Sequence, residues 1–390
     1  PAAFARDAIG ELERLYVRFS QEAGRDPALE DAARAETAGL QAGDPENRAL
    51  WETFVRVSLA EFEAVYRRMG VRFDAVLGES FYQPLLQPLV DELKARGIAE
   101  DDQGAVVIRF DEADGKNLTP MLIRKSDGAA LYATTDLAGL RYRERTWAPD
   151  RVVYVTDTRQ QLHFRQLFAA ARKAGLTGAE LVHVAFGVLS LPEGSMSSRK
   201  GNVVRLMDLL DEAARRARVV VDDKSPHLDP AEREAIAEAV GVGAVRYADL
   251  SQNPQSDIVF EWDRMLSLDG NTAPFLLYAL ARCRSIQRKA GAPPGTVEGL
   301  RIGHPLERAL ALALLRFPEA VASALASTRP NLLCDHLFGL AQAFNRFYYE
   351  LPVLRAEPQE RVSRLAMVEA TARVLGRGLE IVGIRPLERM

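Results

Sequence analysis

A change in the spacing of apolar residues near residue 150 constrains the fold more than any other feature of this sequence. The run RVVYVTD (151–157) is almost continuously apolar, TRQQLHFRQLFAAARKAG (158–175) has apolar residues at helical spacing, and ELVHVAFG (180–187) is apolar again. This order predicts a β-α-β unit with parallel strands buried on both faces, in a doubly wound α/β sheet. Ligands bind such sheets at the carboxyl ends of the strands, here Asp157 to Gln160 and the residues after Gly187.

The rest of the chain surrounds this unit with other patterns. Residues 1–70 have helical spacing and end at Gly70, and VRFDAVLG (71–78) is predicted to be a strand. Strands are also expected at AVVIRF (105–110) and around a hairpin turn at Asp127-Gly128. From residue 274 onward the pattern is purely helical. We therefore predict an α/β nucleotide-binding, Rossmann-like domain with a helical insertion (1–270), followed by an all-α helix bundle (271–390).

The stretch LPEGSMSSRKGN (191–202) follows the second buried strand and precedes a helical run. Its hydroxyls, glycines and two cations have two interpretations. They are typical of a solvated turn, and they are also typical of a loop that wraps phosphate oxygens. Because the stretch lies beyond the carboxyl end of a predicted strand, its position favours the phosphate loop.

Composition excludes several classes of protein. A hydrophobic content of 47% and a charged content of 27% are ordinary for a soluble globular protein, and no apolar run approaches the ~20 residues of a membrane span. We expect no membrane insertion. Cys283 and Cys334 lack the spacing of a zinc site or a disulfide framework, so we expect no metal site and a reducing, cytoplasmic location.

The charge is distributed unevenly along the chain. Residues 274–390 contain 16 Lys+Arg and 10 Asp+Glu, a balance of +6, whereas the whole chain has −4. This excess suits phosphate binding, although a GC-rich genome would also enrich arginine. Tyr278, Arg282, Ser285 and Lys289 form one stripe on the first helix of this region. The stripe could stack a base and hold phosphates, or it could be an ordinary solvent-exposed face.

Several ordered blocks of sequence resemble one family, the arginyl-tRNA synthetases of class I. They are GESFY (78–82), KSDGAALYATTDLA (125–138), YVTDTRQQLHFRQLF (154–168), FGVLSLPEGSMSSRKGNVVRLMDLLDEA (186–213), DLSQNPQSDIVFEWDRMLSLDGNTAPFLLYALARCRS (249–285) and GIRPLERM (383–390). The resemblance implies ATP-dependent ligation of L-arginine to its tRNA through arginyl-adenylate. It also implies ATP as a substrate with Mg²⁺, arginine tRNA as a partner and a monomeric enzyme.

The resemblance implies an arginine pocket and a catalytic loop. The pocket residues would be Glu79, Tyr132, Asp136 and Gln160. The loop, the family's version of KMSKS, would comprise Ser195, Met196, Ser197, Ser198, Arg199 and Lys200. Both lysine positions of the generic motif are serines here, so Arg199 and Lys200 would supply the positive charge. Without the resemblance, Glu79 would be interpreted as a turn residue and Asp136 as a helix cap.

The resemblance also places Tyr349 and Met390 next to the anticodon loop, where an aromatic ring and a thioether can pack on unstacked bases. Because it implies that this helical domain reads the anticodon, we expect Tyr278 and Arg282 of the stripe to bind tRNA as well. The alternatives are that Tyr349 belongs to the bundle core and that Met390 is a frayed terminus.

Two features of the family are not found in this sequence. None of the five histidines stands in the HxGH pattern of the HIGH motif, and the family's N-terminal tRNA-binding domain is also missing. We therefore expect either a fragment of a longer enzyme or a shortened relative. A catalytically inactive tRNA-binding paralogue or regulatory fragment is the main alternative function. An unrelated nucleotide-binding α/β protein is a weaker one, because the pocket residues argue against it.

Overall fold

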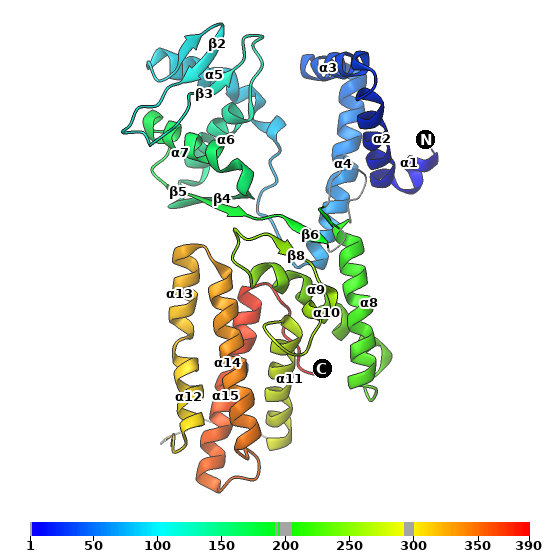
Figure 1. The fold of residues 1–390 in the computed structure, drawn as a ribbon, viewed down its shortest axis with the longest axis vertical. Helices are drawn as coiled ribbons and strands as arrows, with labels where there is room; N and C mark the ends of the chain where they lie inside the picture. The colour runs from blue at the N-terminus through cyan, green and yellow to red at the C-terminus, as the bar shows by residue number, and fades with distance from the viewer. Residues whose placement is uncertain (1, 192–193, 196–204, 292–299) are drawn as a thin grey trace. The chain divides into compact units, whose positions relative to one another are not determined.

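The computed structural model describes residues 2–191, 194–195, 205–291 and 300–390. The chain folds into two compact units. The first contains Pro1–Arg72, Leu189–Asn253 and Ile258–Met390, and the second contains Phe73–Val188 and Pro254–Asp257. Figure 1 follows the chain through both units by colour. The predicted boundary at residue 270 is a different division of the chain and stays a prediction.

The second unit contains the predicted β-α-β arrangement. Its elements are η1 (Glu79–Tyr82), α5 (Gln83–Ala95), β1 (Glu100–Asp102), β2 (Ala105–Ile108), β3 (Met121–Arg124), α6 (Tyr132–Trp147), β4 (Arg151–Asp157), η2 (Thr158–Gln160), α7 (Gln161–Ala174) and β5 (Glu180–Phe186). Strands β4 and β5 pair in parallel, and the register runs from Arg151 opposite Glu180 to Asp157 opposite Phe186. The carboxyl ends of both strands therefore meet at one edge, as predicted.

The prediction that β4 is buried on both faces is wrong for this structure. Helix α7 packs its buried Phe164 and Leu167 into the core of the unit, and Val152 of β4 is buried there too. By contrast, Val153 and Val155 are 42% and 62% exposed. Alternate residues of a strand point to opposite faces, and no described element of the second unit covers the second face.

Two further strand predictions have different outcomes. The turn at Asp127-Gly128 forms, with Gly128 at φ +87°, and Arg124 bridges to Ala130 before α6 begins. The strand predicted at residues 71–78 is wrong, because that segment, described in full, has no regular structure. A short apolar run becomes a strand only where a neighbouring strand completes its hydrogen bonds. The observed antiparallel sheet is β1-β2-β3.

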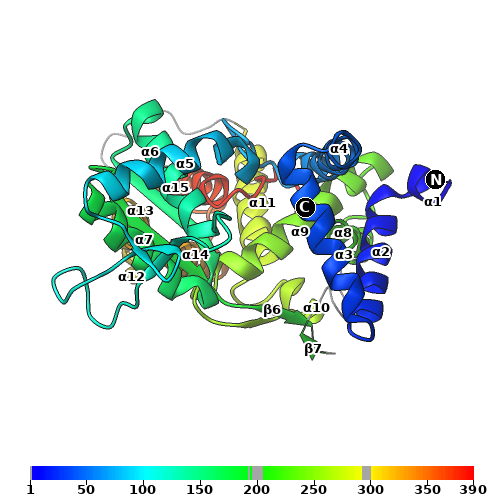
Figure 2. The ribbon, with the colours of Figure 1, turned by 90° about the horizontal axis from the view of Figure 1, so that it is seen from above.

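The first unit begins with the predicted helices, α1 (Ala2–Arg6), α2 (Ala8–Ala23), α3 (Pro27–Ala42) and α4 (Pro45–Arg68). It continues with β6 (Leu189–Leu191), β7 (Gly194–Ser195), α8 (Leu206–Lys224), α9 (Pro230–Leu250), β8 (Ile258–Val259) and α10 (Trp262–Met265). Asp-Pro pairs start α3, α4 and α9. The aspartate accepts a backbone N–H, and the proline fits the first helical position. Arg68 of α4 donates hydrogen bonds to Asp211 of α8 and Glu238 of α9. Figure 2 shows the ribbon of these three helices.

The carboxyl-terminal part of the first unit is a helix bundle, as predicted. It consists of α11 (Ala273–Ala290), α12 (Pro305–Leu315), α13 (Phe317–Ser327), α14 (Pro330–Glu350) and α15 (Pro358–Ile381). In Figure 1, α12 and α13 lie end to end along one side of α14 and α15. The apolar stripe of α11 is buried. Leu276, Ala279 and Cys283 have no exposed surface, and Ile286 retains 4%.

One segment of this bundle is apolar enough to cross a membrane by length and composition. It is Pro305–Ser327, with a mean hydropathy of 1.6. In the structure it forms two helices, α12 and α13, which meet at Arg316. Both helices pack against α14, and α12 carries a buried glutamate, Glu307, that pairs with Arg364 of α15. Most of the segment is nevertheless not buried: 6% of its apolar window lies inside the structure, and Leu315 and Leu325 are exposed.

Candidate functional site

The residues predicted to bind arginine all lie in the second unit, at the starts and ends of its short elements. Glu79 opens η1, Tyr132 opens α6, Asp136 lies one turn later, and Gln160 closes η2. The Tyr142 ring of α6 packs against two rings of η1. Its centre lies 5.0 Å from that of Phe81 and 5.8 Å from that of Tyr82. This packing fixes η1, and with it the position of Glu79, against the helix that carries Asp136.

Helix α6 begins at Tyr132 because its first turn is fastened to β3. The Thr134 hydroxyl donates to the Ile123 carbonyl and accepts the Leu131 N–H, so a buried side chain satisfies backbone groups at the junction. Tyr132 and Asp136 are four residues apart in a continuous helix and share a face. Tyr132 is 72% exposed, so its ring is open to a ligand.

The Asp136 carboxylate has a partner that the sequence did not predict. His163 Nε2 lies 2.7 Å from Asp136 Oδ2. An ionised carboxylate only accepts hydrogen bonds, so Nε2 carries the hydrogen and donates. Asp136 is the fifth residue of α6, so the interpretation of this residue as a helix cap is wrong. No local pattern in the sequence indicated this pair, because His163, in the first turn of α7, is 27 residues from Asp136.

A second histidine lies near His163. His183 of β5 stacks on Phe164 with ring centres 4.4 Å apart, and its Nε2 is 2.8 Å from the Thr156 hydroxyl. Burial, reinforced by the nearby His163, lowers the pKa of His183. Burial also raises the pKa of Tyr154 to about 12, although Arg143 opposes this. The side chains of His183 and Tyr154 are therefore both uncharged at neutral pH.

The other two predicted pocket residues remain open to solvent. Glu79 and Gln160 are exposed, and neither makes a hydrogen bond recorded among the described residues. The carboxylate of Asp157, near Gln160 in the sequence, already accepts hydrogen bonds from within the chain. It caps η2 through the Arg159 N–H and accepts two hydrogen bonds from the Arg159 guanidinium, which hold its pKa below the usual range. Glu79, Tyr132 and Gln160 are thus free to take a ligand, and Asp136 is oriented by His163.

The predicted catalytic loop falls largely outside the described residues. Ser195 ends β7, whose backbone pairs with β6, and β6 in turn pairs in parallel with β8. Met196, Ser197, Ser198, Arg199 and Lys200 lie outside the described residues. Their assignment as a phosphate loop stays a prediction.

The predicted tRNA-binding residues come together on the helix bundle. The Arg282 guanidinium of α11 lies over three rings, at 4.7 Å from Tyr278, 5.2 Å from Tyr348 and 5.6 Å from Tyr349. It also donates to Asn345 Oδ1 at 2.8 Å. Tyr349 is 77% exposed, so the alternative that it belongs to the bundle core is wrong. The sequence did not indicate Tyr348 or Asn345 as neighbours of Arg282.

The carboxyl terminus is ordered against the same helix. Arg288 donates to the Glu388 carbonyl at 2.9 Å, and Met390 packs on the bundle core. The alternative that Met390 is a frayed terminus is therefore wrong. A cavity of about 350 Å³ lies here, and its lining includes Tyr278, Arg282, Ser285 and Met390. Lys289, the last residue of the predicted stripe, does not line it.

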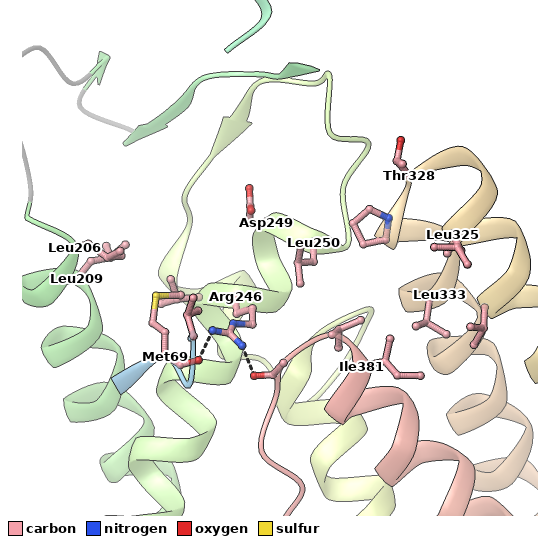
Figure 3. A pocket seen from close by; sticks show the side chains of 17 residues that line it. Met69, Leu206, Leu209, Arg246, Asp249, Leu250, Leu325, Thr328, Leu333 and Ile381 are labelled. Atoms are coloured by element: carbon pink, nitrogen blue, oxygen red, sulfur yellow. Dashed lines mark hydrogen bonds between the residues drawn. The ribbon is translucent and has the colours of Figure 1, made fainter. Parts of the chain in front are cut away.

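A cavity of about 870 Å³ lies elsewhere in the first unit (Figure 3). Its wall is mostly apolar, with Leu209, Leu325 and Ile381 among its lining residues. Arg246 donates to the carbonyls of Met69 and Gly383 at its base, and burial lowers the pKa of this arginine. None of the predicted site residues lines this cavity, so its size alone does not make it the functional site.

Two protein-family models match the chain. Residues 2–262 match the catalytic domain of class I (R) tRNA synthetases, and residues 276–390 match the DALR anticodon-binding domain. The fold is therefore that of a class I aminoacyl-tRNA synthetase, with a Rossmann-like catalytic core followed by a helical anticodon-binding domain, as predicted. Enzymes of this class use ATP.

Comparison with individual proteins narrows the class. The arginine–tRNA ligase of Fusobacterium nucleatum is 46% identical over 100% of this chain and 68% of its own length, and that of Chloroflexus aggregans is 46% identical over 98% and 67%. The solved arginyl-tRNA synthetase of Thermus thermophilus aligns with a TM-score of 0.84 and 29% identity over 97% of this chain and 69% of its own. That of Plasmodium falciparum aligns with a TM-score of 0.80 and 26% identity over 93% and 62%.

The chain belongs to the arginyl-tRNA synthetase family and carries the catalytic and anticodon-binding domains of an arginine–tRNA ligase. It spans about two thirds of the length of these relatives. The alternative of an unrelated nucleotide-binding protein is wrong.

Proposed function

We propose that Glu79, Tyr132, Asp136 and Gln160 bind the arginine substrate, and that Asp136 receives its guanidinium. The hydrogen bond from His163 to Asp136 is the observation that carries this proposal, because it orients a carboxylate beside the exposed Tyr132. A guanidinium presents five donors in a rigid fork, and two carboxylates offer the acceptors that hold it and disfavour lysine.

The reaction proceeds in two steps. The carboxylate of arginine attacks the α-phosphorus of ATP, which gives arginyl-adenylate and releases pyrophosphate. A hydroxyl at the 3′ end of the tRNA then attacks the arginyl carbonyl carbon and releases AMP. No covalent enzyme intermediate is required, so catalysis comes from positioning and from stabilising the charge that develops. Residues Ser195 to Lys200 act on that charge at the phosphates, and Mg²⁺ enters bound mainly to the ATP phosphates.

The helix bundle binds arginine tRNA through Tyr278, Arg282, Tyr349 and Met390. Exposed rings and a cation at one end of α11 and α14 support this role. The chain acts as a monomer in the cytoplasm, with its second domain beginning near residue 271. Cys283 and Cys334 are unpaired and buried, and burial raises the pKa of both thiols, which fits a reducing compartment.

Calorimetric titration of the 390-residue chain tests the arginine pocket. We expect arginine to bind far more tightly than lysine, which lacks the planar fork, and than citrulline, which lacks the charge. Equal binding of arginine and citrulline would refute the assignment of the two carboxylates. Arginine-dependent exchange of pyrophosphate into ATP, measured with and without tRNA, tests the first chemical step. Tight tRNA binding without exchange would favour the alternative of an inactive tRNA-binding paralogue or a regulatory fragment that lacks the HIGH motif.

A further inference from the structure

The contact between His163 and Asp136 joins two helices at the proposed arginine pocket. We propose that His163 is a positioning residue that fixes the Asp136 carboxylate for recognition of the guanidinium. This inference rests on the proposed function. It adds a residue that does not touch the substrate itself but determines which edge of Asp136 the substrate meets.

His163 is the hydrogen-bond partner recorded for the Asp136 side chain among the described residues. The Asp136 side chain is otherwise partly open to solvent, with 33% of its surface exposed. The bond occupies Oδ2, so Oδ1 and the remaining lone pairs are left for a ligand. Without His163, the carboxylate could rotate about its side-chain torsions at the edge of the site, and arginine binding would have to restrict that motion.

His163 is itself held by the core of the unit. Its ring meets the edge of Phe164 with ring centres 5.1 Å apart, and Phe164 is buried with 3% exposure. His183 stacks on the same Phe164 ring with ring centres 4.4 Å apart, and its Nε2 lies 2.8 Å from the Thr156 hydroxyl. The imidazole therefore connects a rigid aromatic layer to an exposed carboxylate, an arrangement that holds a binding group within a narrow range of positions.

The inference predicts a selective effect on the guanidinium. Replacing His163 by alanine should weaken arginine binding roughly tenfold, the contribution of about one hydrogen bond. Citrulline shares the amino acid part of arginine but lacks its positive charge, so its binding should change little. The ratio of arginine to citrulline affinity should therefore fall about tenfold. General damage to the pocket would weaken both ligands alike and leave the ratio unchanged.

The experiment compares H163A, H163Q and a control on the same helix. The glutamine variant returns an N–H donor near the position of Nε2 and should recover most of the ratio. Gln166→Ala removes a different hydrogen bond from α7, the one that Gln166 donates to the Thr119 carbonyl at 2.8 Å, and should leave the ratio at the wild-type value. Arginine affinity is measured by calorimetry, citrulline affinity by displacement of arginine, and folding by circular dichroism.

The outcomes separate this inference from the function on which it rests. If the wild-type chain does not discriminate arginine from citrulline, the proposed pocket is refuted and His163 has no such role. If the wild type discriminates and H163A does so equally well, the positioning role alone is refuted. If H163A does not fold, His163→Leu, which keeps volume but removes the donor, is compared with H163Q in its place.

Discussion

Asp136 and Glu79 both carry a carboxylate in the proposed pocket, but their surroundings differ. Asp136 is held by His163, whereas Glu79 stands exposed at the start of η1. A charged hydrogen bond to a preorganised acceptor costs less entropy than one to a mobile acceptor. Asp136 is therefore expected to contribute more to arginine affinity than Glu79 does.

The first prediction concerns these two carboxylates. Asp136→Asn and Glu79→Gln each keep shape but remove charge, so each should weaken arginine binding by about 1.5 to 3 kcal/mol, with the larger loss at Asp136. The measurement is calorimetric titration with arginine. Asp150→Asn, an exposed carboxylate at the opposite end of β4, is the control and should bind like wild type. Unchanged arginine affinity in both pocket variants would contradict the assignment.

Glu307 presents a different case, a carboxylate buried for stability. It is paired with Arg364, and the two side chains are 4% and 8% exposed. Burial alone raises the pKa of Glu307, but the Arg364 guanidinium and the N–H groups of His304 and Gly303 outweigh burial and bring the pKa below its usual 4.5. The folded state therefore binds a proton at Glu307 less readily than the unfolded state does.

The second prediction follows from that pKa. Glu307→Gln should lower the free energy of unfolding at pH 7 by about 3 kcal/mol, because it leaves a buried guanidinium without its main counterion. Since the folded pKa is depressed, this contribution is complete above pH 4.5 and disappears as the pH falls through the lower, folded value. Urea unfolding of the wild type and the Glu307→Gln variant at pH 7 and at about pH 3.5 measures this contribution. The exposed Glu319→Gln should change stability by less than about 0.5 kcal/mol.

At the scale of elements, α8 and α9 of the first unit approach each other closely at Gly241 of α9. A Cβ atom placed there would lie 2.5 Å from the Ala214 nitrogen and 2.7 Å from the Ala213 carbonyl carbon of α8. Both are backbone atoms of a packed helix and cannot move aside as a flexible side chain can. The absence of a side chain at residue 241 therefore sets the distance between α8 and α9.

The third prediction tests this approach. Gly241→Ala should destabilise the protein by roughly 1 to 3 kcal/mol through overpacking. Gly339→Ala is the matched control, because Gly339 also lies inside a helix but has open space around its Cβ position. That variant should gain up to about 1 kcal/mol from helix propensity. Thermal unfolding of both variants gives the comparison, and a Gly241→Ala protein as stable as the control would contradict the packing argument.

The contacts between α11 and α14 give Arg282 a structural role in addition to the one predicted from the sequence. The sequence places Arg282 on a stripe facing solvent, where it would meet phosphates. In the structure its guanidinium donates a hydrogen bond to Asn345 and lies over three tyrosine rings. Such contacts fix the rings as well as the cation. Arg282 therefore also supports the exposed Tyr349, and its loss would disturb ring positions in addition to removing a charge.

At the scale of the whole molecule, the balance of charge predicts how nucleic acid binds. Residues 274–390 carry +6, and residues 1–273 carry −10, the difference between −4 and +6. A net-negative protein that binds tRNA must do so through a local basic surface. Binding through such a surface depends strongly on salt, because phosphate contacts release counterions.

The fourth prediction is that the 390-residue chain binds arginine tRNA with an affinity that falls steeply between 50 and 200 mM salt. Tyr349→Ala should cost about 1 to 3 kcal/mol of the cognate affinity if one base stacks on its ring. Tyr16→Ala, an exposed tyrosine of α2, is the control. Filter binding of cognate and anticodon-swapped transcripts measures both effects. Equal affinity of the wild type for the two transcripts would leave the bundle as a scaffold.

Sequence by itself determined the elements whose signals are local. The β4-α7-β5 unit, the helices of the first 70 residues and the buried stripe of α11 follow from periodicity and from caps such as Asp44-Pro45, which depend on residues a few positions apart. The ordered motif blocks also determined the family.

Only the tertiary structure decided which distant side chains meet. His163 reaches Asp136 across 27 residues, and Asn345 reaches Arg282 across 63, and no local pattern encodes either pair. The same reason explains the failed predictions. The segment 71–78 has the composition of a strand but no strand beside it, and β4 has the composition of a doubly buried strand but a covering layer on one face among the described residues. Strand pairing, burial and the orientation of a carboxylate all depend on neighbours that folding brings from elsewhere in the chain.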